Sequence, residues 1–108
     1  MTETEIVEIA GKALADAANS PARVYLFGSR VRGDADETSD FDFLVVERQV
    51  SDRFAEAVHL SRVLGKLRVP GDVVVVGEEQ FDAWRTVAGT LMHDASREGR
   101  VIADSWAA

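Results

Sequence analysis

The stretch VYLFGSRVRGDADETSDFDFLVV, from Val24 to Val46, decides the fold that this sequence predicts. Two apolar runs flank it, Val24–Phe27 and Phe41–Val46, and short apolar runs bounded by turn signals are typical of buried strands. The first run ends at Gly28-Ser29, where glycine permits a sharp turn or a close approach of the backbone to a ligand. We therefore expect a strand, a short helical turn, a loop and a second strand.

Asp40 and Asp42 stand where the second strand begins, and their spacing of two places both side chains on one face. Two adjacent carboxylates repel each other, so the pair becomes favourable when a divalent cation lies between them, and oxygen ligands suit Mg²⁺. Gly28 and Ser29 open a helical turn whose free backbone N–H groups can bind a phosphate. Together these features indicate phosphoryl or nucleotidyl transfer. A third carboxylate, Asp72, precedes another apolar run.

The remaining elements follow from hydrophobic periodicity and breaker residues. The pattern predicts helices over the ranges Thr2–Ala18, Asp52–Leu67, Glu78–Arg85 and Thr86–Glu98. It predicts strands over Arg23–Phe27, Phe41–Glu47 and Val73–Val76, with a short fourth strand near Val101. The buried side of the Asp52–Leu67 helix is expected to be the line of Phe54, Val58, Ser61 and Leu64, widened by Leu60, Val63 and Leu67. The fold class is therefore α/β (α+β), a small mixed sheet of three to four strands flanked by helices.

Length and composition restrict the function further. The chain has 108 residues, which suits a single domain over residues 1–108 with one modest core. No apolar run approaches the ~20 residues that span a bilayer, and the acidic start lacks the features of a signal peptide, so a cytoplasmic protein is expected. The formal net charge of -7 opposes non-specific binding of nucleic acids.

Two arginines and a group of acids in the connecting loop have more than one interpretation. Arg30 and Arg32 suit phosphate oxygens, because the guanidinium fork binds them well, but they suit surface ion pairs equally well. The acidic partners for such pairs, expected to lie in a solvated loop, are Asp34, Asp36 and Glu37.

The chain resembles the minimal nucleotidyltransferases, a family of the DNA polymerase beta-like superfamily. The matching residues are Gly28-Ser29-Arg30-x-Arg32-Gly33, then Ser39-Asp40-x-Asp42, then Asp72 at the start of a later strand. The resemblance implies the polymerase beta-like fold and a site in which two Mg²⁺ ions are held by Asp40, Asp42 and Asp72. It also implies that Asp72 takes the proton of the attacking hydroxyl, and that Gly28, Ser29 and Arg30 bind ATP or another nucleoside triphosphate.

The same resemblance implies a partner. Small stand-alone members of this family are commonly antitoxins that adenylylate a tyrosine of an all-helical HEPN toxin. Two other functions stay open at this point. The chain could be a binding module that neutralises a partner protein by contact alone, or it could add nucleotides to RNA. The acidic balance and the lack of an aromatic-basic surface disfavour addition to RNA.

Overall fold

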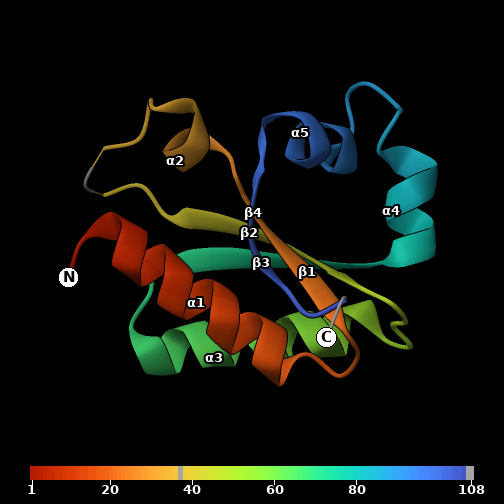
Figure 1. Cartoon of the computed structure of the whole chain (residues 1–108), viewed down its shortest axis with the longest axis horizontal. Helices are drawn as coiled ribbons and strands as arrows, with labels where there is room; N and C mark the ends of the chain where they lie inside the picture. Colours follow the sequence, from red (N-terminus) through yellow and green to blue (C-terminus); the bar gives the residue numbers. More distant parts are fainter. Residues whose placement is uncertain (37, 107–108) are drawn as a thin grey trace.

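The computed structural model, which describes residues 1–36 and 38–106, is built on a mixed four-stranded sheet with the order β3-β2-β1-β4 (Figure 1). The strands are β1 (Ala22–Phe27), β2 (Phe41–Glu47), β3 (Gly71–Gly77) and β4 (Arg100–Asp104). The middle pair, β1 and β2, is antiparallel, β2 runs parallel to β3, and β4 lies antiparallel to β1. The predicted fold class and the predicted strands are confirmed.

Helices cover both faces of this sheet (Figure 1). On one face lie α1 (Glu3–Ala17) and α3 (Arg53–Leu67), and on the other lie α4 (Glu78–Trp84) and α5 (Leu91–Glu98). A single helical turn, α2 (Ser29–Arg32), follows β1 directly. None of the helices in the described ranges is both long and apolar enough to cross a membrane.

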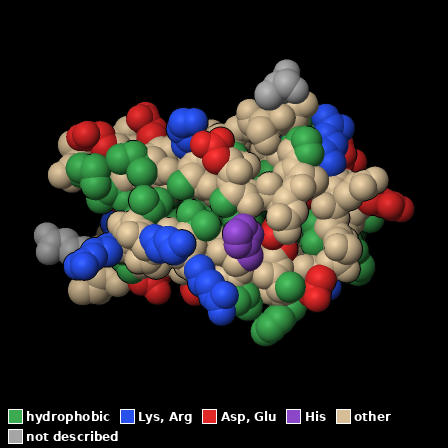
Figure 2. All heavy atoms as spheres, turned by 90° about the horizontal axis from the view of Figure 1, so that it is seen from below, with side chains coloured by type: hydrophobic (Ala, Val, Ile, Leu, Met, Phe, Trp, Pro, Cys, Tyr) green, Lys and Arg blue, Asp and Glu red, His purple; other side chains and the backbone are tan. Residues whose placement is uncertain are grey.

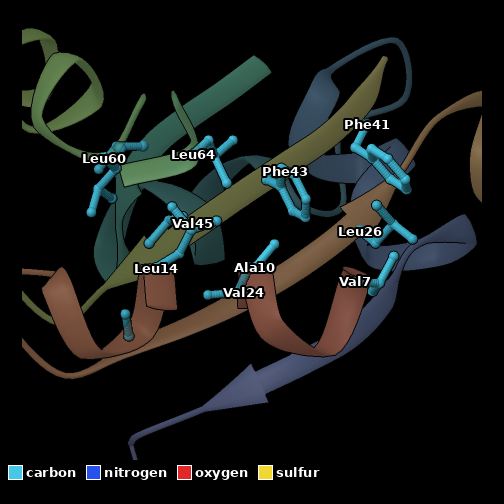
Figure 3. Close-up of a cluster of buried hydrophobic side chains, with 12 residues drawn as sticks. Val7, Ala10, Leu14, Val24, Leu26, Phe41, Phe43, Val45, Leu60 and Leu64 are labelled. Carbon is cyan, nitrogen blue, oxygen red and sulfur yellow. The ribbon is translucent and has the colours of Figure 1, made fainter. Parts of the chain in front are cut away.

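The main core fills the space between the sheet and the helices α1 and α3 (Figure 3). Alternation along β2 sends Phe41, Phe43 and Val45 to this face, while Leu44 and Val46 pack on the opposite face. Asp42 lies two and four residues before Leu44 and Val46, so its side chain shares their face of the sheet. The acid therefore belongs to the face that α4 and α5 cover, at the end where β2 begins.

Side-chain caps fix the starts of the two long helices. Thr2 caps α1 in a capping box with Glu5, and the Asp52 carboxylate accepts a hydrogen bond of 3.0 Å from the Ala55 N–H at the start of α3. Both boundaries agree with the predicted helices within a residue or two. These caps satisfy N–H groups that a helix leaves without internal partners.

The predicted buried side of α3 is wrong in part. Phe54 is 81% exposed, and Val58 and Leu67 are exposed too. Leu60 and Leu64 are buried as predicted, and Glu56, which was not predicted, is buried beside them. At about 100° per residue, Phe54 lies far around the helix from the Glu56–Leu60–Leu64 line that touches the sheet. Figure 2, which views the molecule from the side of α1 and α3, shows apolar and basic side chains exposed together on this surface.

The predicted helix Thr86–Glu98 is also too long, because α5 begins only at Leu91. Gly89 adopts a φ of 87°, in the left-handed region, which ends any helical path through residues 85–90. Thr90 then caps α5 by accepting a hydrogen bond of 3.2 Å from the His93 N–H. A glycine followed by a threonine cap is a helix boundary that hydrophobic periodicity alone does not reveal.

Candidate active site

Two of the three predicted acids lie side by side. Asp42 and Asp72 are register partners on the adjacent parallel strands β2 and β3, so their side chains share one face of the sheet about 5 Å apart at the backbone. Asp40 stands just before β2 and is exposed, as is Asp72, whereas Asp42 is half-buried. The parallel pairing therefore brings Asp42 and Asp72 to the end of the sheet where β2 and β3 begin, and Asp40 precedes β2 at the same end.

The burial and the acidic surroundings of Asp42 change the pKa of its carboxyl. Burial raises the pKa of its carboxyl above the ordinary value, and the charges of Asp72 and Asp40 raise it further, while the nearby charge of Arg32 lowers it. An acid in this position is stabilised by a proton or by a bound cation. The site thus carries excess negative charge that a divalent cation would neutralise.

Gly28 makes room for the Asp42 carboxylate. It follows Phe27, the antiparallel partner of Asp42, and its φ of 83° is one that residues with a side chain rarely adopt. A Cβ at this position would overlap Oδ2 of Asp42 and lie 3.2 Å from its Cγ. Both the backbone conformation and the close approach therefore require glycine at the start of α2.

A polar hollow of about 420 Å³ opens on the Gly28 side of Asp42. Its lining comes from two parts of the chain, the β1–α2–β2 unit and α5, and consists of Phe27, Gly28, Ser29, Arg32, Asp42, Leu91, Asp94 and Glu98. A larger hollow of about 640 Å³ lies at the opposite end of β2, beside Arg48 and Gly77. None of the three acids lines that larger hollow, so we take the smaller one as the candidate site.

The two arginines of α2 have different surroundings. Arg30 donates to the Ser39 carbonyl oxygen and to Oε1 of Glu3, and its guanidinium lies 4.4 Å from the ring centre of Phe41. These contacts fasten the loop before β2 to the start of α1. Arg30 would have to leave them to reach a phosphate, so its predicted role in nucleotide binding stays a prediction.

Arg32 is the arginine that lines the hollow with Asp42. Its side chain is 48% exposed and lies 3.4 Å from Oδ2 of Asp34 and 3.8 Å from Oε2 of Glu98. Asp34 and Asp36 are exposed, as the sequence predicts, and the expectation for Glu37 falls outside the described residues.

Sequence reasoning did not find the contribution of α5. Leu91, Asp94 and Glu98 line the hollow from more than 40 residues away along the chain. Their spacing of three and four residues places them on one helical face, which is the only signal that the sequence offers for grouping them.

The donor set fits a magnesium ion. Within the described residues, no three acidic or histidine side chains already stand together as a compact metal cluster. Asp40, Asp42 and Asp72 nevertheless supply only oxygen ligands at one end of the sheet. The charges of Asp72 and Asp40, which help to raise the pKa of Asp42, are the ones that a divalent cation would neutralise. These three residues are the ones that would hold it.

Comparison with known families gives one match over most of the chain. The nucleotidyltransferase domain family matches residues 7–93, a range that includes all three acids and the Gly28-Ser29 turn. Among proteins with curated descriptions, none matches this chain significantly.

Solved structures with a similar fold have low sequence identity. A protein from Sulfolobus solfataricus described as a candidate nucleotidyltransferase is 24% identical, with a TM-score of 0.62 over 91% of this chain and 77% of that chain. A toxin–antitoxin structure with AMP-PNP is 20% identical, with a TM-score of 0.63 over 98% of this chain and 77% of that chain. A tri-AMPylated HEPN toxin from Shewanella oneidensis in complex with an MNT antitoxin gives 20% identity and a TM-score of 0.58, over 94% of this chain and 72% of that chain.

Proposed function

The chain belongs to the nucleotidyltransferase domain family, and we propose that it transfers AMP from ATP to a tyrosine hydroxyl of a protein partner. The observation that carries the proposal is that Asp42 lies between a hollow on one side and a second carboxylate on the other. On its β1 side lies the hollow that begins at Gly28 and Ser29, and on its β3 side lies Asp72 at the open edge of the sheet. One side suits a nucleotide and the other suits an acceptor.

The chain's own residues have separate roles in this proposal. Asp40, Asp42 and Asp72 would hold two Mg²⁺ ions, which when bound neutralise the triphosphate and polarise its α-phosphate. The N–H groups at the start of α2 have no acceptor within the helix, so the turn at Gly28 and Ser29 binds the terminal phosphates. Arg32 is the charged side chain of the hollow that suits the phosphate oxygens.

The reaction itself is a displacement at the α-phosphorus. The tyrosine oxygen attacks this atom in line with the leaving group and forms a new P–O bond, while the bond from the α-phosphorus to the bridging oxygen of the β-phosphate breaks. Asp72 takes the proton of the hydroxyl as general base. Pyrophosphate leaves, and AMP stays on the acceptor as an ester.

The choice of a protein acceptor rests on charge and on the similar structures. A chain with net charge -7 repels polynucleotides and attracts a basic protein, such as an enzyme that cleaves RNA. Two of the similar structures are toxin–antitoxin assemblies, one with AMP-PNP and one with an AMPylated HEPN toxin. We therefore propose that this chain is an antitoxin that modifies a HEPN-type toxin.

The test is co-expression of the chain with the protein encoded by the neighbouring gene, followed by mass spectrometry of that partner. The expected result is a mass increase of one AMP per modified residue, mapped to tyrosine. An Asp42→Asn variant, produced in parallel, should leave the partner unmodified. A partner that is fully inhibited but unmodified would instead favour the contact-only binding module. In a parallel incubation with labelled ATP, label on RNA would favour nucleotide addition to RNA.

A further inference from the structure

The strand β3 forms one edge of the sheet and is unusually open for an edge. Among the described residues it pairs with β2 alone, and its central residues, Val73–Val76, are all valine. The opposite edge strand, β4, differs because charged residues stand at both its ends and a register shift interrupts its pairing with β1. Proteins usually protect edges by such charges and irregularities, and β3 has neither within its valine run.

Backbone geometry determines which groups β3 presents outward. The Phe41 N–H donates to the Pro70 carbonyl oxygen over 2.9 Å, and Phe41 is the register partner of Gly71. In a parallel ladder this pattern directs the N–H and C=O of Gly71 away from β2. Because the direction alternates along a strand, Val73 and Val75 also direct their N–H and C=O groups to the outer edge.

The open edge begins at the proposed catalytic site. Asp72 is exposed and lies on the same sheet face as Asp42, while Val73 and Val75 pack on the other face toward α3. The hollow on the Gly28 side of Asp42 is the place for the nucleotide, and Asp72 is absent from its lining. An acceptor therefore has to approach from the β3 side.

We propose that an extended segment outside the helices of the acceptor protein adds to the sheet as a fifth strand along β3, and so places its tyrosine beside Asp72. The inference rests on the proposed function and specifies how that site receives its acceptor. Side chains directly opposite on neighbouring strands have Cβ atoms about 5 Å apart, which is within reach of a tyrosine ring. Main-chain hydrogen bonds to Val73 and Val75 supply the binding energy, and the side-chain position opposite Asp72 selects for a residue with a hydroxyl group.

A second copy of this chain is the main competing occupant of the edge. The β3 sequence, GDVVVVG, contains no serine, threonine or tyrosine, so self-pairing would fill the acceptor position without providing a hydroxyl. Self-pairing would block the site rather than complete it. The structure therefore favours a foreign segment that alternates apolar residues on the α3 side with a hydroxyl residue on the Asp72 side.

Amide exchange can detect the added strand directly. The probe is the capped pentapeptide Thr-Val-Tyr-Val-Thr, whose two valines share one face and whose tyrosine lies on the other. Hydrogen exchange followed by NMR, at millimolar peptide with ATP and Mg²⁺, should slow at least tenfold at the outward amides of Val73 and Val75. The inward amides of Val74 and Val76 are already bonded to β2 and serve as the internal control.

A variant tests the same contact through activity. Val73→Pro removes one outward N–H, which an edge strand tolerates. We expect Val73→Pro to lower AMP transfer to the peptide at least tenfold, while the stabilisation of the protein by Mg²⁺ and ATP in thermal scans stays that of the wild type and so serves as the control.

The outcomes separate the inference from the proposed function. Slowed exchange at Val73 and Val75 without any transfer supports the docking mode and contradicts the transferase. Transfer to the peptide with unchanged exchange at these amides overturns the docking mode, even where Val73→Pro fails to fold. Protection that rises with protein concentration in the absence of peptide assigns the edge to a second copy and also overturns the proposal.

Discussion

Replacing Glu47 by glutamine should make the protein more stable at high pH. Glu47 ends β2 and is 1% exposed, and its Oε1 accepts hydrogen bonds from the Ser20 N–H at 3.2 Å and the Ser20 hydroxyl at 3.3 Å. Its Oε2 is buried without a partner. Burial, together with the Glu56 carboxylate beside it, raises the pKa of Glu47 to about 8. A proton on Oε2 makes this atom a donor that the neighbouring Glu56 carboxylate can accept from, whereas the ionised carboxylate leaves Oε2 without a partner.

The magnitude follows from linkage between protonation and folding. Glu47 has its ordinary pKa of 4.5 in the unfolded chain and about 8 in the folded one. Between these two pKa values the folded state keeps a proton on Glu47 that the unfolded state releases. The stabilisation by protonated Glu47 is therefore complete below pH 4.5 and is lost as the pH rises to about 8. At ~1.4 kcal/mol for each pH unit, the loss approaches ~5 kcal/mol. Glutamine cannot ionise, and its amide donates where the Glu47 proton does.

Urea unfolding of the wild type and Glu47→Gln between pH 5 and pH 9 measures this effect. The free energies of unfolding should converge near pH 5 and diverge in favour of Glu47→Gln by several kcal/mol at pH 9. Glu79→Gln changes an exposed residue on α4 and should follow the wild type throughout. All other ionisable groups are common to the two proteins, including His59, which lines a small hollow together with Glu47 and Glu56. Parallel pH profiles for wild type and Glu47→Gln would refute the reasoning.

Three further predictions concern the catalytic end of the sheet. Gly28→Ala should cost about 2 kcal/mol or more in urea unfolding, because alanine is strained at a φ of 83° and its Cβ meets Asp42, and a cost below ~0.5 kcal/mol would contradict the close approach. Asp42→Asn should leave the metal-free melting temperature equal or higher, since it removes a repelled carboxylate, and should abolish most of the stabilisation by Mg²⁺ and ATP seen in thermal scans of the wild type. Asp40→Asn and Asp72→Asn should each lower AMP transfer by about 100-fold or more in a labelled-ATP assay, whereas Ser29→Ala should be milder because backbone N–H groups remain at the turn. Near-normal turnover of Asp40→Asn with Mg²⁺ would remove that residue from the mechanism.

The strands were predictable because each combines an apolar run with a clear boundary. Gly28 follows the last residue of β1, Asp40 precedes the first residue of β2, and Pro70 precedes the first residue of β3. The pairing of Asp42 with Asp72 was not predictable in detail, because a parallel register depends on how the crossover helix α3 packs against both strands. The side of α3 that packs on the sheet contains Glu56, Leu60 and Leu64. Hydrophobic periodicity predicted Phe54 on this side and did not predict a buried glutamate.

The difference between Arg30 and Arg32 shows why local pattern identifies a chemistry without selecting the residue that performs it. The two stand two residues apart on a single helical turn, so their side chains leave it about 160° apart. Arg30 is 13% exposed and is held by Glu3, Ser39 and Phe41, partners from other elements that the motif does not contain. Arg32 has two exposed acidic partners, at 3.4 Å and 3.8 Å, and it already lines the hollow. A phosphate can therefore recruit Arg32 by displacing weak surface ion pairs, whereas recruiting Arg30 would detach the loop that carries Asp40 to the site.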